Sequence, residues 1–289
     1  MGSQEVKIAV IGGSGLYDIA GLRVEKEIQP ETPWGKPSDT ITVGEFQGKK
    51  IAFLPRHGRG HFFNPSEVPY RANIAALKSL GVEEIIAYSA VGSLREEIAP
   101  RDFALPDQII DRTKGIRAST FYEGGIVVHA TFGDPFSEHL ALAVTEAAKS
   151  VPGLKLHTKK TLVCMEGPAF STRAESIMYR DLGGDVINMS ALPEAKLARE
   201  AEISYQMICM STDYDSWRHE EEAVTTDFII GNLHANSDNA KNLLAAILPL
   251  LGKKPNPLKG SIKNAVLTAP EKRSPALKEK LNWLLPGTF

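Results

Sequence analysis

Residues 161–217 constrain the fold more than any other stretch, because strand-like and helix-like patterns alternate along them. TLVCMEGPAF (161–170) predicts a buried strand and a turn, and SYQMICMSTDYDSW (204–217) predicts a second buried strand. Between them, STRAESIMYRDLGG (171–184) predicts a helix, and residues 185–203 predict a strand, a turn and another helix. Strands that alternate with helices predict an α/β fold.

Each predicted strand of this stretch ends in polar side chains. The clusters are Glu166 to Glu175, Asn188 to Ser190, and Thr212 to Asp215. Ligands of α/β sheets bind beyond the carboxyl ends of the strands, so these clusters are candidates for a functional site. Glu175 is equally well placed as a helix-capping residue. Asp213 and Asp215 point the same way only if the backbone stays extended, and a solvated loop is the alternative.

The N-terminal half repeats the pattern of a strand followed by a small-residue turn. VKIAVIGGSGL (6–16) predicts a strand that enters a glycine turn around Ser14. The Ser14 hydroxyl and free backbone N–H groups suit an oxyanion, although a plain strand turn stays open. EEIIAYSAVGSL (83–94) predicts a strand whose end contains Ser89 and Ala90. Small residues there suit either close approach of a ligand or tight packing.

The run KIAFLPRHGRGH (50–61) predicts a buried strand that ends in a basic loop. Arg56 offers a planar guanidinium that matches the geometry of phosphate, and His57 follows it. A metal site built on His57 and His61 is an alternative, but no nearby Cys or carboxylate completes its ligand set. A solvated basic loop is the third interpretation.

The rest of the chain continues the alternation of strands and helices. We expect edge strands and a loop over 23–48, helices over 64–82 and 137–151, a strand over 101–113, a loop over 114–136, and a long helix within 219–251. The prediction is therefore a single α/β domain over 1–289, with a central mixed β-sheet flanked by helices. Residues 252–289 are expected to form a C-terminal linker and helix.

Composition excludes several classes of protein. The formal net charge of −2 provides no overall basic surface for nucleic acid or an anionic membrane. No apolar run reaches membrane-spanning length, and the first residues lack the apolar core of a signal peptide. Cys164 and Cys209 lie in apolar strand-like runs and are expected to be buried free thiols. The expected location is the cytoplasm, with the nucleus left open.

Six motifs together resemble the trimeric purine nucleoside phosphorylase family over nearly the whole chain, from residue 6 to 289. They are IGGSGL, PRHGRGH, SAVGSLREEI, EGPAFSTRAES, VINMSALPE and STDYDSW. One motif alone is a weak signal, whereas six in the order of the family are specific. The resemblance implies a nucleoside phosphorylase-like fold and a homotrimer.

The activity that the resemblance implies is phosphorolysis by a pentosyltransferase. In the branch that matches best, inorganic phosphate attacks S-methyl-5′-thioadenosine. The products are adenine and 5-methylthio-α-D-ribose 1-phosphate, and the pathway is methionine and purine salvage. The resemblance implies no metal, no organic cofactor, and no nucleic-acid or membrane partner.

The alternative activity is that of a purine nucleoside phosphorylase for inosine and guanosine. In those enzymes a Glu follows the Phe of the GPxF turn, and an Asn replaces Asp213. Ser171 and Asp213 in this chain instead favour a 6-aminopurine. A non-catalytic nucleoside-binding protein is a third possibility, which the presence of Arg56, His57 and Asp213 disfavours.

The resemblance also implies a role for individual residues. The implied phosphate ligands are Ser14, Arg56, His57, Ser89, Ala90 and Ser190. The implied nucleoside contacts are Phe170, Met189, Asp213, Asp215, Val224, Thr226, and His129 and Leu284 from a neighbouring subunit. Asp213 is implied as the general acid at N7 of the purine, and Asp215 as the acceptor for its 6-amino group.

Two residues depart from the family pattern. Thr226 stands where the family commonly has an aliphatic residue, and Ala169 stands where an Arg is usual. The methyl group of Thr226 suits the thioether, while its hydroxyl leaves selectivity against a 5′-hydroxyl open. The loss of the Arg at Ala169 has no account in the sequence.

Overall fold

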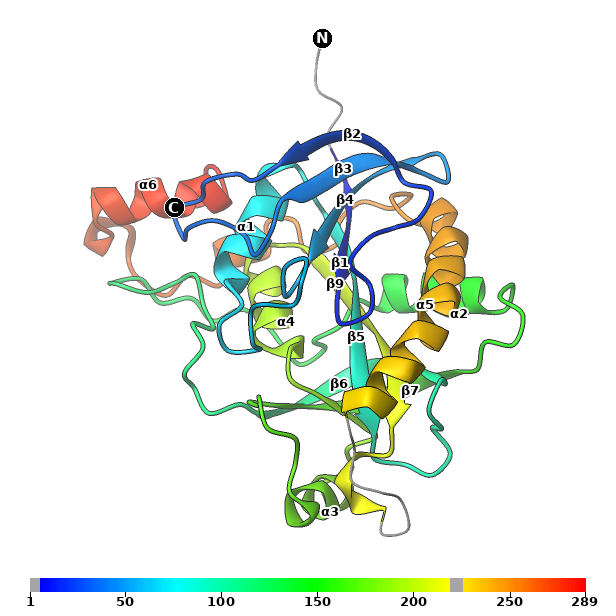
Figure 1. The fold of residues 1–289 in the computed structure, drawn as a ribbon. Coiled ribbons are helices and arrows are strands. Elements are labelled where there is room, and N and C mark those ends of the chain that lie inside the picture. The colour runs from blue at the N-terminus through cyan, green and yellow to red at the C-terminus, as the bar shows by residue number, and fades with distance from the viewer. Residues whose placement is uncertain (1–5, 219–225) are drawn as a thin grey trace.

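A computed structural model describes residues 6–218 and 226–289, with the backbone alone for residues 226–230, 234 and 235. A mixed sheet of nine strands runs through the centre, and helices cover both of its faces (Figure 1). The strands are β1 (Ile8–Gly12), β2 (Arg23–Ile28), β3 (Ile41–Phe46), β4 (Lys49–Pro55), β5 (Glu84–Ser93), β6 (Phe103–Arg112), β7 (Leu156–Met165), β8 (Val186–Asn188) and β9 (Ser204–Asp213). The α-helices are α1 (Tyr70–Ser79), α2 (Glu138–Ala148), α3 (Arg173–Asp181), α4 (Ala191–Glu200), α5 (Thr226–Ile247) and α6 (Pro275–Leu284). The predicted single-domain α/β class is confirmed.

The strand order brings the predicted polar clusters to one edge of the sheet. The order is β2-β3-β4-β1-β5-β8-β7-β6-β9, and β5 also pairs with β9. Strand β1 is parallel to β4 and β5, and β5 is parallel to β9. Strand β5 stays paired with β9 as far as Gly92, and at Gly92 and Ser93 it also pairs with β8, so β5, β8, β7, β6 and β9 close into a ring. Gly12 pairs with Pro55 and Gly92 pairs with Asp213, which aligns the carboxyl ends of four strands.

Alternate residues of the central strands pack into two separate hydrophobic clusters. In β1, Ala9 and Ile11 join the cluster formed with α1, α4 and α6, while Ile8 and Val10 join the cluster formed with α2 and α5. Both faces of the strand are therefore buried, as is usual for parallel strands. This explains why β1 reads as an unbroken apolar run rather than as an alternating one.

Two local expectations are corrected by the structure. The helix predicted from residue 64 begins at Tyr70, because the Asn64 side chain accepts two backbone N–H groups and holds residues 64–69 in a turn. The chain after Asp213 does not stay extended, because Asp215 adopts a φ of 49°. The N–H of Asp215 then donates to Asp213 Oδ1 at 2.8 Å.

Residues after α5 are tied to the body of the domain before they enter α6. The Glu202 carboxylate accepts hydrogen bonds from the backbone of Gly260 at 2.7 Å and of Ile262 at 2.9 Å. Leu281 and Leu284 of α6 are buried in the cluster that also contains α1 and α4. Helix α6 lies beside α1 at one end of the molecule (Figure 1).

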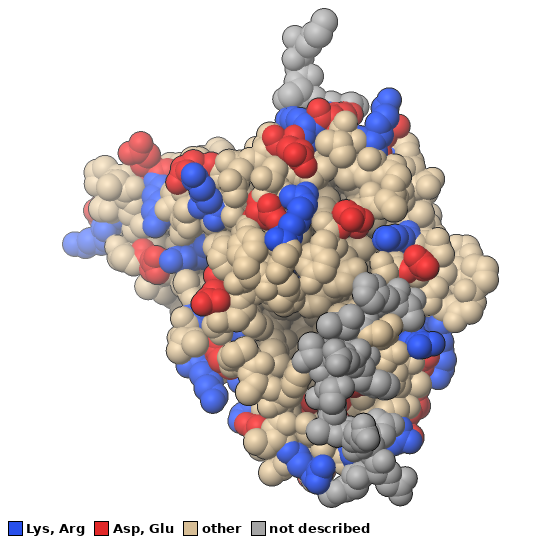
Figure 2. Space-filling view, in the orientation of Figure 1, with Lys and Arg blue, Asp and Glu red and all other residues tan. Residues whose placement is uncertain are grey.

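The features predicted from composition can be located in the structure. Cys164 and Cys209 are buried free thiols, as predicted. Acidic and basic side chains are interspersed over the coloured atoms of the face in Figure 2, in keeping with the small net charge. Within the described part of the chain, no helix has the length and the apolar character needed to cross a membrane.

Candidate active site

A cavity of about 630 Å³ opens where β1, β4, β5, β8 and β9 end. The predicted site residues that line it are Ser14, Arg56, His57, Ser89, Ala90, Phe170, Met189, Ser190, Asp213 and Asp215. They come from separate parts of the chain and meet because the carboxyl ends of parallel strands lie at one edge of the sheet. The volume is in the range of pockets that enclose a small organic ligand.

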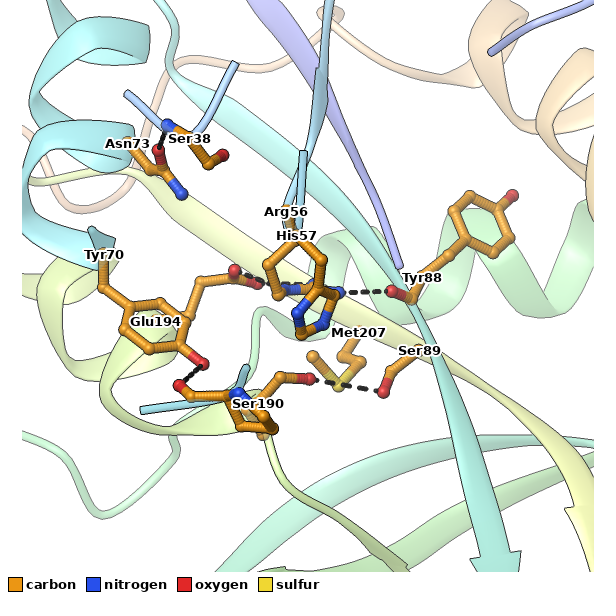
Figure 3. A network of polar contacts seen from close by, with 12 residues as sticks. Ser38, Arg56, His57, Tyr70, Asn73, Tyr88, Ser89, Ser190, Glu194 and Met207 are labelled. Atoms are coloured by element: carbon orange, nitrogen blue, oxygen red, sulfur yellow. Dashed lines mark hydrogen bonds and ion pairs between the residues drawn. The ribbon is translucent and has the colours of Figure 1, made fainter. Parts of the chain in front are cut away.

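Arg56 is fully buried, and its guanidinium is fixed by protein groups on two sides. Its Nε and Nη2 donate to the two carboxylate oxygens of Glu194 at 2.7 and 2.8 Å, and its Nη1 donates to the Tyr88 carbonyl at 2.9 Å (Figure 3). The Tyr205 hydroxyl donates to the same Glu194 carboxylate at 2.7 Å. Burial lowers the pKa of Arg56, but the carboxylate of Glu194 outweighs it and raises that pKa, so the cation is retained.

His57 is a neutral hydrogen-bond acceptor in the wall of the cavity. Its Nδ1 lies 2.9 Å from the carbonyl oxygen of Phe63, so Nδ1 carries the hydrogen and Nε2 is left as the acceptor. Burial, and then the neighbouring Arg56 cation, lower the pKa of His57 to about 3. Its ring stacks on His61, with the centroids 4.4 Å apart. Among the described residues, no three His, Cys, Asp or Glu side chains are grouped as metal ligands would be.

The buried neutral state of His57 predicts a specific loss of stability in acid. Because the pKa of His57 is lower in the folded protein than in the unfolded chain, the unfolded chain takes up a proton first as the pH falls. The contribution of the neutral His57 ring to the free energy of unfolding is therefore complete above pH 6.5 and is lost as the pH falls toward 3. Between these pH values we expect the free energy of unfolding of the wild type to fall by about 1.4 kcal/mol per pH unit because of His57. The His57→Gln variant should lack this part of the pH dependence. Denaturant unfolding of both proteins between pH 4.5 and 8 measures it.

The exposed His129 provides the control for this experiment, since His129→Gln leaves the buried imidazole in place. Its pH profile should run parallel to that of the wild type. A His57→Gln profile that also stays parallel to the wild type would show that the His57 ring titrates alike in both states.

Small and hydroxyl side chains surround the space beside Arg56 and His57. Ser89 Oγ and Ser190 Oγ lie 3.4 Å apart, and Asn188 Nδ2 donates to Ser89 Oγ at 3.0 Å. The glycine turn that carries Ser14 lies against this group, because a Cβ atom at Gly13 would be 2.4 Å from the Tyr88 carbonyl oxygen. Only glycine fits at that position, and the hydroxyl groups around it can donate to an oxyanion.

The two aspartates line the same cavity farther along the paired strands β5 and β9, since Ser89 pairs with Cys209 whereas Gly92 pairs with Asp213. Asp213 is 6% exposed, and its Oδ2 lies 2.7 Å from Thr212 Oγ1. Asp215 is 8% exposed, and burial raises its pKa. Its buried Oδ2 atom has no hydrogen-bond partner of good geometry among the described residues, although the nearby hydroxyl groups of Ser176 and Ser171 lower the pKa of the carboxyl. A buried acceptor without a donor at a cavity wall suits a ligand that brings an N–H group.

Phe170 and Met189 form apolar walls between the two polar ends of the cavity. Phe170 is half exposed, so its ring is free to cover a planar ligand. Gly167 permits the turn that brings these walls together, since its φ is 69° and a Cβ there would lie 2.3 Å from Met189 Sδ. Ala169 is exposed in the same turn.

Ser171 and His129 do not line the cavity, and two further predicted residues cannot be placed. Ser171 is buried beneath the Phe170 turn, where its hydroxyl faces Met165 Sδ at 3.4 Å. His129 is exposed, and its backbone N–H donates to the Ala265 carbonyl. Val224 and the side chain of Thr226 lie outside the described residues.

Leu284 lies on α6, and its predicted role in the pocket of a neighbouring subunit stays a prediction. Its side chain is 1% exposed and belongs to the core of its own chain, packed with the residues that surround α1 and α4. The apolar pattern of the C-terminal helix predicts packing but does not show which body the helix packs against.

Sequence reasoning missed other residues of the site. Tyr17, Phe62 and Leu233 also line the cavity, and Glu194 holds the buried arginine from α4. Glu194 reads as an ordinary polar position within a helix, so no local signal distinguishes it. For Phe62, the pair of aromatic residues directly after the basic loop is the sequence pattern that could have indicated a cavity-lining role.

Residues 7–249 match the family model described as the phosphorylase superfamily. The chain belongs to this superfamily. It is 54% identical over 297 residues to the S-methyl-5′-thioadenosine phosphorylase of Emericella nidulans, covering 98% of this chain and 84% of that protein. It is 55% identical to the Neurospora crassa protein of the same name, covering 98% and 95% of the two chains. Within the superfamily, the chain belongs with the S-methyl-5′-thioadenosine phosphorylases.

Solved structures of the same family have the same fold. A methylthioadenosine phosphorylase from an Antarctic soil metagenomic library superposes with a TM-score of 0.90 at 45% identity, covering 98% of this chain and all of the other. The Schistosoma mansoni methylthioadenosine phosphorylase, solved in complex with adenine, superposes with a TM-score of 0.87 at 34% identity, covering 92% of this chain and 100% of that one.

Proposed function

We propose that the chain catalyses phosphorolysis of S-methyl-5′-thioadenosine, which transfers the 5-methylthioribosyl group from adenine to inorganic phosphate. The observation that carries the proposal is a single cavity with hydroxyl groups and a fixed arginine at one end and two buried aspartates at the other. The names of the relatives, with more than half of the aligned residues identical, support the same reaction.

Phosphate is proposed to bind at the end formed by Ser14, Arg56, His57, Ser89, Ala90 and Ser190. Hydroxyl groups and backbone N–H groups of the glycine turn donate to its oxygens, and His57 Nε2 accepts a hydrogen from a protonated oxygen. Because Glu194 already pairs with Arg56, hydrogen bonds rather than net charge hold the anion. A phosphate oxygen then lies close to the anomeric carbon.

Cleavage of the glycosidic bond proceeds through a transition state with oxocarbenium character. A phosphate oxygen forms a bond to C1′ while the C1′–N9 bond breaks, and the electron pair of that bond leaves with adenine. The bound phosphate stabilises the positive charge that develops on the ribosyl group. Met189 and Phe170 are proposed to enclose the sugar and the base.

The base leaves more readily when the charge on its ring is neutralised. Asp213 is proposed to donate a proton to N7 as a general acid, with the Thr212 hydroxyl orienting it. Asp215 Oδ2 is proposed to accept the 6-amino N–H, which gives this buried oxygen a partner. A 6-oxopurine carries a carbonyl oxygen in place of the amino group, and this oxygen cannot donate a hydrogen bond to Asp215 Oδ2. Inosine and guanosine are therefore disfavoured.

The 5′-methylthio group requires an apolar pocket beside the ribose. Val224 and Thr226 of the same chain are proposed to form it together with His129 of a neighbouring subunit, next to Leu233 of the cavity wall. A Schistosoma mansoni relative is described as an adenosine/methylthioadenosine phosphorylase. A tolerance for the 5′-hydroxyl of adenosine is therefore the alternative for a pocket that contains Thr226.

A homotrimer is proposed as the working form. The side chains of Val127 and Leu267 are 48% and 66% exposed, and they lie on adjoining segments joined by the bridge between Val128 and Val266. His129 belongs to the same exposed segment. Contact between subunits would cover these apolar side chains, and a solution mass equal to that of one chain would rule the trimer out.

Release of adenine from S-methyl-5′-thioadenosine is expected only when phosphate is present, because phosphate supplies the attacking oxygen. Assays with and without phosphate, run beside adenosine and inosine, measure this directly. Inosine should react at least about 10²-fold more slowly in kcat/KM, since its 6-oxo group leaves Asp215 without a donor.

Each contrary outcome identifies a different error. Preference for inosine would refute the assigned roles of Asp213 and Asp215. Rates on adenosine equal to those on the thioether would refute an apolar 5′ pocket. No release from any nucleoside would favour a protein that binds nucleosides without catalysis.

A further inference from the structure

Arg117 is a buried arginine that the reaction described above does not use. It lies in the irregular segment between β6 and α2, is 7% exposed, and does not line the cavity. Its Nε donates to Glu166 Oε1 at 2.8 Å, and its Nη1 lies 2.6 Å from the carbonyl oxygens of both Met189 and Leu192. Its Nη2 donates to the backbone carbonyl of Glu166. The guanidinium therefore joins the turn after β7 to the turn after β8.

Glu166 connects a third segment to the same point. Its Oε1 also accepts from the Ser66 hydroxyl, and its Oε2 accepts from the backbone N–H of Lys114 at 2.6 Å. The residues beside Ser66, namely Asn64, Pro65 and Glu67, line the cavity. The Arg117–Glu166 pair thus holds three segments that together form one side of the cavity.

We propose that Arg117 is a positioning residue that sets the nucleoside-binding wall through Met189 and the turn carrying Phe170. This inference rests on the proposed function, because it assigns that wall to the sugar and the base. Arginine suits the task, since its planar guanidinium directs several N–H donors at once to separate acceptors. A lysine ammonium is a point charge that cannot span these acceptors in one plane.

The position of Arg117 predicts which kinetic constant depends on it. The anion end of the cavity is held by other contacts, namely those between Arg56, Glu194 and Tyr88, and between Ser89 and Asn188. Arg117 makes none of these contacts. Its loss should therefore displace the nucleoside wall more than the anion end, where Ser190 is the one proposed phosphate ligand in the turn that Arg117 holds. A displacement of about 1 Å at a substrate-positioning group can change the rate by about 10²-fold.

The test compares Arg117→Met with Arg95→Met in steady-state kinetics with both substrates varied. Arg95 is a matched control, because it also donates to a carboxylate, that of Asp185, and to a backbone carbonyl, yet it does not line or brace the cavity. For Arg117→Met we expect the KM for S-methyl-5′-thioadenosine to rise at least about tenfold, with a clearly smaller rise in the KM for phosphate, which Ser190 alone transmits. Arg95→Met should leave both constants within about twofold.

A second readout is independent of catalysis. Hydrogen exchange of residues 165–171 and 186–192 should be faster in Arg117→Met than in the wild type, while Arg95→Met leaves these two segments unchanged. If Arg117→Met does not fold, Glu166→Gln serves instead, because it keeps the size of the side chain and removes the charge that orients the guanidinium. The same rise in nucleoside KM, at reduced size, is expected.

The results separate the two proposals. A wild-type enzyme that releases no adenine would overturn the proposed function, and the exchange experiment would still test Arg117. Equal rises in both KM values, or unchanged exchange in the two segments, would show that Arg117 supports the fold without positioning the nucleoside wall.

Discussion

Asp213→Asn is expected to lower kcat/KM for S-methyl-5′-thioadenosine by about 10²- to 10⁴-fold. An asparagine amide can donate a hydrogen bond to N7 of adenine, but it cannot transfer a proton to the leaving base. The loss should appear in kcat as well as in kcat/KM, because the proton is needed in the transition state rather than for binding. Initial rates of adenine release at saturating phosphate measure both constants.

Thr212→Val is the matched control for this substitution. Valine keeps the shape of threonine but removes the hydroxyl that lies 2.7 Å from Asp213 Oδ2. The carboxyl remains, so a loss of no more than about tenfold is expected. Asp213→Asn activity within a few-fold of the wild type would rule out Asp213 as the general acid. Thermal unfolding should accompany both assays, since the Asp213 carboxylate also accepts the N–H of Asp215.

Glu194→Gln is expected to destabilise the protein by about 3–5 kcal/mol, because it leaves the Arg56 cation buried without its counter-charge. Both side chains are completely buried, so water cannot replace the lost carboxylate. An effect of that size corresponds to a fall in Tm of about 5–8 °C. The KM for phosphate should rise too, since the guanidinium is then free to move out of its fixed orientation.

The double variant Arg56→Met, Glu194→Gln distinguishes charge burial from lost packing. It removes the cation together with its partner, so its stability should exceed that of Glu194→Gln. Its phosphate-dependent activity should nevertheless stay low, because Arg56 is absent. A double variant less stable than both single variants would mean that the pair contributes net stability to the core.

The strand-end clusters could be predicted from the sequence because they depend on local patterns. An apolar run followed by glycine or polar residues identifies a strand and its end, and parallel strands bring such ends to one edge. Ser14, Ser89 and Asp213 were therefore found from their own neighbourhoods. The capping role of Glu175 was also a local inference, and the structure confirms a capping box with Thr172.

The partners of these residues could not be predicted, because they depend on contacts between distant segments. Glu194 pairs with Arg56 across 138 positions, and Arg117 contacts a carboxylate 49 positions away. Each lies in a stretch whose local pattern suits an exposed helix or loop. The backbone turn at Asp215 was also missed, since its positive φ depends on the hydrogen bond to Asp213 and not on residue type.

The pairing of β5 with β1, β8 and β9 gives the two ends of the cavity different freedom to change during evolution. Ser89 and Ala90 of the anion end lie within β5 and pair with β9, so that a new side chain there would disturb both strands. The base end is built largely on turns, such as the one that carries the exposed Ala169 and Phe170. Substitutions in these turns can alter which nucleoside is accepted while the phosphate chemistry stays constant. A lineage with this architecture can thus acquire new base specificities while the residues that bind phosphate stay the same.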